Sequence, residues 1–433
     1  MAGFVELLRN NRNYRYTWMG QVVSEIGDHF NNIAVFSLAL ERTGSGMVVT
    51  GVMLSRAIPA VLAGPVAGVL LDRLNRKTVM VASDLVRSAM ALGFVAAVAR
   101  PEPWLLYILS ALLMFASPFF TSGRASILPA ITTQDELHTA NALTQTTQWT
   151  TLTVGALLAG FSATHLGYAA AFVLNALSFL FSAWAISRLR SREGAFRAPR
   201  RILGEDQVVR PWHEYRDGLR YMKSQPLILA IGLVGVGWAT GGGAAQILFP
   251  LFGEVVFDRG PAGIGTIWGF AGAGLLAGGA FAHWLGSRVG FEAYKRTIAV
   301  CYVVHGGAYM VFSRMESYAA ALFFIALSRA AVAVSSILNF SQLLRHVPDQ
   351  YRGRVFSTNE SMVWSTMMIS MALAGIASNH FTPRDIGLVA GLLSSTTALF
   401  WTWADLRGLL GRPPRLGVEP REIEIHGEPR HQG

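Results

Sequence analysis

Long apolar runs recur along the whole chain, and short polar connections separate them. Each run holds roughly 20 residues, the length that a helix needs to cross a hydrocarbon core about 30 Å thick. The pattern therefore predicts an all-α membrane protein with twelve transmembrane helices. We place these helices at 17–40, 48–71, 79–99, 103–123, 142–165 and 168–187, and then at 227–252, 262–286, 296–313, 317–341, 357–379 and 386–406.

The polar connection from 188 to 225 divides the runs into two sets of six. The run 51–71 aligns with the run 265–285, and the segment 128–141 resembles the segment 347–359. Parallel six-helix repeats are an architecture of transporters, which handle their substrate between the two halves. We therefore expect an N-terminal six-helix bundle at 1–187, a basic linker with an amphipathic helix at 188–225, a C-terminal six-helix bundle at 226–407, and a disordered tail at 408–433.

The composition excludes a soluble globular protein, because 52% of the residues are hydrophobic and 14% are charged. The net charge of +10 is spread over many connections, so it indicates membrane topology and not nucleic-acid binding. Of the 36 lysines and arginines, five lie in connections on one side and three lie within spans. The other 28 lie on the side of both termini. This bias predicts a multi-pass protein of the inner (plasma) membrane with both termini in the cytoplasm.

Four polar residues lie on one face of the first span. Gln21, Glu25, Asp28 and Asn32 follow each other at spacings of four, three and four residues. Charged groups within hydrocarbon are costly, so they mark functional sites by default. Asp28 lies near the middle of its span, where removal from water favours the protonated carboxyl and a change of access can release the proton. We therefore predict ion or proton coupling by Asp28, and also by Glu25; the alternative is a structural ion pair.

Three arginines also lie within predicted spans. Arg329 and Arg56 cannot readily lose a proton, so they are predicted to neutralise a carboxylate or to bind an anionic part of a substrate. The alternative for both is a structural ion pair: for Arg329 it is an equal alternative, and for Arg56 it is the one that we favour. Arg87 follows Asp84 by one helical turn, and we interpret these two residues as a local ion pair that supports the neighbouring Asp72 cluster.

Further polar and aromatic side chains occur at related points of the two halves. They are expected to line a cavity, although packing alone is an alternative for each of them. Besides Gln21 and Asn32, this predicted cavity lining comprises Gln145, Gln148, Trp149, Gln246, Glu360 and Trp364.

Signatures of enzymes and of cofactor binding are missing from the sequence. The lysines are Lys77, Lys223 and Lys295, and none of them follows a glycine, so the phosphate-binding loop of ATP-driven pumps is absent. The zinc motif H-E-x-x-H is absent too, and the single cysteine, Cys301, cannot form a disulfide within the chain. We therefore predict a protein that is not an enzyme and that uses no cofactor or metal.

The second span ends in a cluster of charges. The segment 64–77 reads GPVAGVLLDRLNRK, in which Gly64 and Gly68 form a G-x-x-x-G pattern that is expected to let two helices approach closely. The residues from 68 onward resemble the signature loop of the major facilitator superfamily. Matching positions are Gly68, Asp72, Arg73, Arg76 and Lys77, and Asn75 replaces the usual glycine. We interpret the charged residues as a cytoplasmic gate between the halves, in which Asp72 meets the cytoplasmic end of span 357–379.

Within this superfamily the chain resembles the branch of enterobactin exporters and macrolide efflux proteins. The resemblance rests on Ser24, Gly27 and Asp28, on the segments 128–129, 140–143 and 218–221, and on the R-G-R-V sequence at 352–355. It implies a major facilitator fold and export of an amphipathic drug-like or siderophore-like molecule by alternating access. Protons, a small molecule and membrane lipids are the expected partners of a monomer. The alternatives are a lipid or lysophospholipid translocator that needs no proton gradient, and a binding or sensor protein without transport.

Overall fold

A computed structural model describes residues 3–100, 102–191, 196, 211–286 and 288–411. Within these ranges every regular element is a helix. A short α1 (Phe4–Asn10) precedes α2 (Arg12–Thr43), α3 (Gly46–Arg73), α4 (Arg76–Val98), α5 (Trp104–Ile131) and α6 (Gln134–Ser187). After α7 (Pro211–Ser224) follow α8 (Pro226–Leu251) with a π-helical turn η1 (Phe252–Val256), α9 (Gly260–Gly286), α10 (Phe291–Arg314), α11 (Tyr318–His346), α12 (Asp349–Ala377) and α13 (Pro383–Leu406).

Apart from the short α1 and the linker helix α7, the helices correspond one to one with the predicted spans, except that α6 contains two of them. Its two segments meet at Gly167, whose φ of 80° lies in a region that glycine adopts without steric cost. In the described part of the chain, nine helices are long and apolar enough to cross a membrane, and α6 counts once among them. When the two segments of α6 are counted separately and the more polar α2 and α10 are added, the number of transmembrane helices among the described residues is twelve. The protein is thus an all-α membrane protein with twelve transmembrane helices in two repeats of six.

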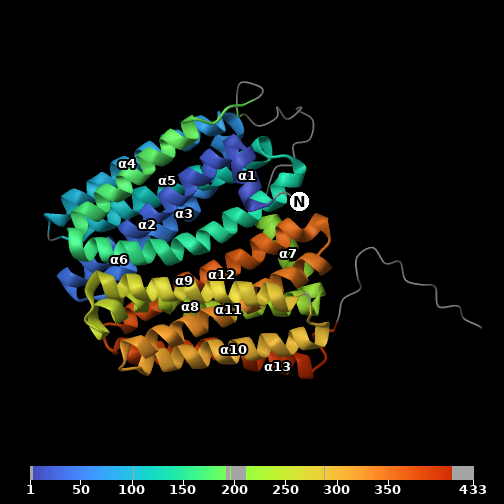
Figure 1. The fold of residues 1–433 in the computed structure, drawn as a ribbon. Coiled ribbons are helices and arrows are strands. Elements are labelled where there is room, and N and C mark those ends of the chain that lie inside the picture. Colours follow the sequence, from blue (N-terminus) through green and yellow to red (C-terminus); the bar gives the residue numbers. More distant parts are fainter. Residues whose placement is uncertain (1–2, 101, 192–195, 197–210, 287, 412–433) are drawn as a thin grey trace, which may run out of the picture.

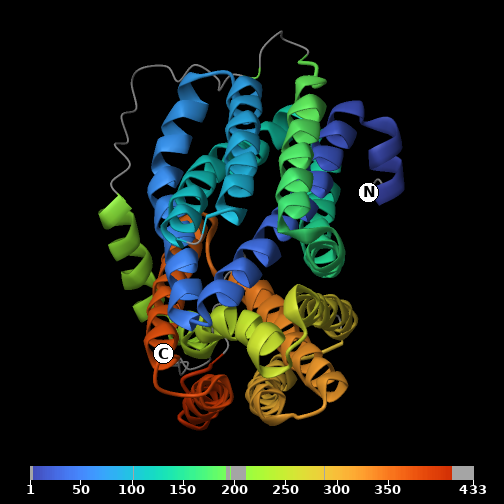
Figure 2. The same cartoon turned by 90° about the vertical axis from the view of Figure 1, so that its left-hand side faces the viewer.

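The two halves lie side by side (Figure 1), with α1–α6 in one layer and α8–α13 in the other. Figure 2 shows the same division from another side, and α7 lies along α12 at its edge. The predicted linker lies outside the described residues at 192–195 and 197–210, and the predicted tail lies outside them from 412 onward. We call the side of the N-terminus and α7 the terminal side, and the side of loops 44–45 and 378–382 the far side.

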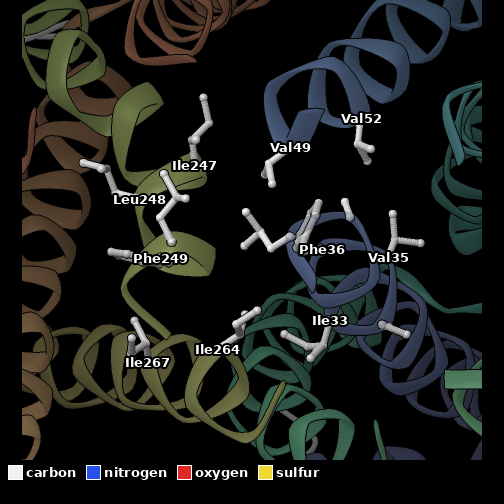
Figure 3. Packing of buried hydrophobic residues seen from close by; sticks show 14 of the residues in the cluster. Ile33, Val35, Phe36, Val49, Val52, Ile247, Leu248, Phe249, Ile264 and Ile267 are labelled. Carbon is white, nitrogen blue, oxygen red and sulfur yellow. The ribbon is translucent and has the colours of Figure 1, made fainter. Parts of the chain in front are cut away.

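A shared apolar core joins the halves on the far side. Figure 3 shows Phe36 and Val49 of α2 and α3 opposite Leu248 and Ile264 of α8 and α9, all of them buried. On the terminal side the cores are separate: one lies within α1–α6 and another within α7–α13. The halves are therefore closed against each other by a shared core on the far side, whereas on the terminal side each half has a core of its own.

Small residues allow the close approach of the halves. A Cβ on Gly265 of α9 would lie 2.4 Å from the carbonyl oxygen of Ala156 on α6, so these backbones touch. Nearer the loops of the far side, a Cβ on Gly375 of α12 would lie 2.7 Å from the Cβ of Thr50 on α3. Ser37 of α2 also donates a hydrogen bond of 2.8 Å to Glu254 of η1.

The expected packing role of Gly64 and Gly68 is wrong in this conformation. A Cβ on either residue would meet nothing within 4 Å, and Gly68 is exposed. The buried small residues of this stretch are Ala63 and Ala67, with 0% exposure. The packed face of α3 therefore lies one residue away from the G-x-x-x-G pattern.

Replacement of Gly375 by leucine is expected to open the far side. The new side chain must displace Thr50, and overpacking of this kind costs about 1–3 kcal/mol, which shifts a two-state balance up to about a hundredfold. Spin-label distances between α3 and α12 should therefore lengthen on the far side. Gly353→Leu is the matched control, because it lies on the same helix with nothing within 4 Å. Equal distances in the two variants would contradict the close contact.

Candidate functional site

A cavity of about 140 Å³ lies between the two halves near mid-depth. It is lined from α2, α3, α6, α8 and α9, by His29, Asn32, Ile33, Phe36, Met53, Arg56, Leu152, Gln246 and Trp268. Arg56 lies ten residues into α3, about 15 Å along the helix and so near the middle of a hydrocarbon core of about 30 Å. Polar groups from both halves face apolar walls here. The volume is below the roughly 300–1,000 Å³ of a pocket for a drug-sized ligand, so in this conformation the cavity has room for only part of such a molecule.

Arg56 is held by a neutral partner. One of its terminal nitrogens, Nη2, donates to Oδ1 of Asn32, while Nη1 is buried without a partner among the described residues. Asn32 follows Asp28 by one helical turn, so the polar face of α2 presents both residues on the same side. The predicted structural pair of Arg56 thus has an asparagine, and not a carboxylate, as its hydrogen-bonding partner.

Asp28 has no direct partner in the described part of the chain. No hydrogen bond or salt bridge to it is present, and its Oδ1 is buried. The charged groups that act on it electrostatically are Arg87, Arg56, Glu25 and Asp84. A carboxylate without hydrogen bonds in a buried setting is unusual, because such groups are normally satisfied. The carboxyl of Asp28 therefore has no hydrogen bond to give up within the described residues.

Glu25 lies in a different environment. Its carboxylate accepts hydrogen bonds from Arg124 at 3.2 Å, Gln21 at 2.9 Å and Thr151 at 2.8 Å. These contacts join α2 to α5 and α6 within the first half. The geometry is that of a structural ion pair, so the two carboxylates on the polar face of α2 differ in what they can do.

The pair of Asp84 and Arg87 is deeply buried. The two residues form the predicted salt bridge, with 0% and 2% exposure. The guanidinium of Arg87 lies between the rings of Phe120 and Phe179, 4.5 and 4.4 Å from their centroids. No described hydrogen bond or salt bridge connects the pair to Asp72. The interpretation as a support of the Asp72 cluster is therefore wrong, and the pair belongs to the interior around Asp28.

Arg329 of α11 is 8% exposed and lies over the ring of Phe249, 5.0 Å from its centroid. No carboxylate lies within salt-bridge distance of it in the described ranges. In this conformation it thus neutralises neither Asp28 nor Glu25. Because Phe249 also packs against Trp268 of the cavity wall, Arg329 lies behind the same aromatic layer in the second half.

The predicted lining residues occupy four different locations. Asn32 and Gln246 line the cavity, and Gln21 is buried beside Glu25. Trp149 packs over Gly279 between the halves. The remaining four side chains are exposed and lie outside this cavity: Gln145, Gln148, Glu360 and Trp364.

The signature loop has two structural and two free charges. Arg76 donates to the carbonyl of Ser126 at 2.8 Å, and Lys77 donates to that of Leu189 at 2.9 Å, so both fix the start of α4. Asp72 and Arg73 are exposed, and neither has a hydrogen bond or salt bridge within the described residues.

Several residues of the site were not predicted from the sequence. His29 and Trp268 line the cavity, and Arg124 neutralises Glu25. His29 could have been identified as a titratable group next to Asp28 inside a span. Arg124 lies one residue beyond the predicted end of its span, where a positive charge indicates only topology.

Two six-helix bundles that enclose a polar cavity at mid-depth define a membrane transporter. A family model described as Major Facilitator Superfamily matches residues 17–371. The chain belongs to this superfamily, as the signature loop predicted, and it is therefore a multi-pass membrane transporter and not an enzyme.

Comparison with individual proteins supports the predicted branch of the family. The chain is 22% identical to macrolide efflux protein A of Streptococcus pyogenes over 380 residues, 87% of this chain and 92% of the relative. It is 26% identical to the enterobactin exporter EntS of Salmonella choleraesuis over 362 residues, 81% of this chain and 82% of the relative. The crystal structure of a bacterial homologue of the iron transporter ferroportin in an inward-facing state has the same fold, with a TM-score of 0.66 at 18% identity. This similarity covers 90% of this chain and 98% of that one.

Proposed function

We propose that the protein exports an amphipathic small molecule, drug-like or siderophore-like, by proton-coupled alternating access. Asp28 is the proton carrier in this proposal. The observation that carries it is the buried, unpartnered Oδ1 of Asp28 on the polar face of α2, one helical turn from the cavity residue Asn32. A proton carrier must be able to change its charge without losing a permanent partner, and Glu25, which is bound to Arg124, meets this requirement less well.

The chemistry of the cavity lining supports the proposed class of substrate, which the cavity can hold in full only after the halves move apart. Its apolar wall, with Phe36 and Trp268, suits an apolar body, and the free Nη1 of Arg56 suits an anionic group. Arg329 can bind the same anionic group after a movement of the halves exposes it to the cavity. The printed names of the two relatives, a macrolide efflux protein and an enterobactin exporter, support export of a molecule of this kind.

The proposed cycle requires the halves to separate on each side in turn. By the distribution of positive charge, the terminal side faces the cytoplasm of a plasma membrane, so the far-side closure corresponds to an inward-facing state. The free Asp72 and Arg73 then form a gate with the terminal end of α12 when the cytoplasmic side closes. We also propose that residues 1–187 and 226–407 move relative to each other as two rigid units. The functional form is a monomer in this proposal, because one chain supplies both walls of the cavity.

A transport screen in proteoliposomes with an imposed pH gradient tests the function. The expected result is accumulation of one or more amphipathic anions, which falls to the level of protein-free vesicles when an ionophore collapses the gradient. The collapse removes the driving force and leaves the protein unchanged, so the same vesicles serve as their own control.

Two other results would overturn the proposal. Transport of a lysophospholipid that continues after collapse of the gradient would identify a lipid translocator. Binding of a ligand without any translocation would identify a membrane sensor.

A further inference from the structure

An apolar groove of about 630 Å³ runs along the outer face of the second half, between α9, α10 and α11. Its floor is made of small residues: Ala277, Gly278, Ala330 and Ala331. A Cβ on Gly278 would lie 2.2 Å from the carbonyl oxygen of Ala330, so α9 and α11 touch backbone to backbone here. The groove forms because these floor positions carry no large side chains.

The rim of the groove faces outward. Phe281 of α9 is 51% exposed and Val300 of α10 is 60% exposed. On a transmembrane helix such side chains meet lipid, so a bilayer places acyl chains against this groove.

One end of the groove carries a free positive charge. Arg296 lines the groove and is exposed, and in the described part of the chain it has no hydrogen bond or salt bridge. The neighbouring Lys295 is bound instead to Glu292 at 2.8 Å and Asp405 at 2.6 Å, outside the groove lining. Among the described residues no acidic side chain lines the groove, and Glu292, one turn before Arg296 on α10, is bound to Lys295. Arg296 is therefore a cation without a hydrogen-bonded or ion-paired partner in the described part of the chain, beside an apolar groove.

The depths of Arg296 and of the apolar groove in the membrane match those of the headgroup and the acyl chain of a phospholipid. Arg296 lies about 7 Å along α10 from its first residue, Phe291, on the terminal side. The groove continues about 12 Å further, to Val304, toward the middle of the membrane. A headgroup at the membrane surface and a chain that points to the midplane would occupy these two parts in this order.

We infer that the groove binds an anionic phospholipid, with one acyl chain over the alanine and glycine floor and the phosphate at Arg296. Basic pockets between transmembrane helices are known to recognise anionic headgroups. An anionic lipid fits this groove better than a zwitterionic one, because a second, positive headgroup charge would find no acidic partner among the described residues of the lining. The groove lies outside the cavity between the halves, so this inference does not depend on the proposed transport mechanism.

Photocrosslinking with the full-length protein in vesicles tests the site. The probes are phosphatidylglycerol and phosphatidylcholine, each with a diazirine in the acyl chain and each at the same mole fraction. Adducts are mapped to peptides of α9, α10 and α11 by mass spectrometry. We expect about fivefold more groove adducts with phosphatidylglycerol, the preference that one arginine near an anionic surface provides.

Two variants and one control define the outcome. Arg296→Gln should reduce labelling by phosphatidylglycerol to the level of phosphatidylcholine, and Ala277→Leu, at an exposed position of the floor, should reduce labelling by both lipids. Arg288→Gln is the matched control, because Arg288 is exposed on the same side and lies outside the groove. Equal labelling of the unmodified protein by both lipids would overturn the inference, as would equal losses in Arg296→Gln and Arg288→Gln. The lipid comparison on the unmodified protein decides the matter even if a variant fails to fold.

Discussion

Replacement of Asp28 by asparagine is expected to reduce gradient-driven substrate accumulation to the level of protein-free vesicles. Asparagine has nearly the same shape and cannot carry a proton, so the variant loses coupling. Because Asp28 has no hydrogen bond or salt bridge in the described part of the protein, the substitution breaks no contact and the fold should be retained. Substrate counterflow, which needs no net proton movement, should persist and can be measured in the same vesicles.

The matched control for this variant is Asp385→Asn. This variant makes the same chemical change at an exposed position in the first turn of α13, where Asp385 is paired with Arg314 at 2.9 Å. This variant should accumulate substrate like the unmodified protein. Loss of counterflow in Asp28→Asn would instead indicate that Asp28 binds the substrate or supports the fold.

Replacement of Arg87 by methionine is expected to destabilise the protein by about 3–5 kcal/mol. Removal of one member of a buried ion pair leaves the other charge without compensation, and the resulting loss of folding stability is about 3–5 kcal/mol. The substitution also removes the stacking of the guanidinium between Phe120 and Phe179. Reversible unfolding in detergent, followed by helical circular dichroism against denaturant, measures the loss.

Two further variants separate the charge from the packing. Asp84→Leu combined with Arg87→Met should recover most of the stability, because no buried charge is left unpaired. Arg314→Met is the exposed counterpart: its partner Asp385 is 46% exposed, and such surface pairs contribute about 0–1 kcal/mol. Similar losses in Arg87→Met and Arg314→Met would contradict the buried, charge-balanced interior.

The number and order of the helices could be predicted because each apolar run must match the thickness of the bilayer. The helix ends could not be predicted from the same signal. The helix expected at 142 begins at Gln134, where Thr133 and Glu136 form a capping box in the polar connection. Likewise α12 begins at Asp349, eight residues before the expected 357. An apolar run marks the hydrocarbon core, whereas local capping sets where the helix starts.

The polar face of α2 was also predictable, because the spacing of its residues fixes which of them share a face. Their partners were not. Arg124 binds Glu25 and Asn32 binds Arg56, which depends on how α2 packs against α5 and α3. For the same reason the sequence pattern of Gly64 and Gly68 did not show which face of α3 is packed. Contacts between helices follow from tertiary packing, to which a single sequence gives no direct access.

Proton movement during transport is the measurement that decides whether Asp28 couples this transporter to a gradient. Vesicles that contain a pH-sensitive dye and the purified protein are given a substrate identified by the transport screen, and internal pH is followed with time. The unmodified protein should move protons only when substrate is present, and Asp28→Asn should move none while its counterflow continues. Substrate-dependent proton movement in Asp28→Asn at the rate of the unmodified protein would contradict the assignment.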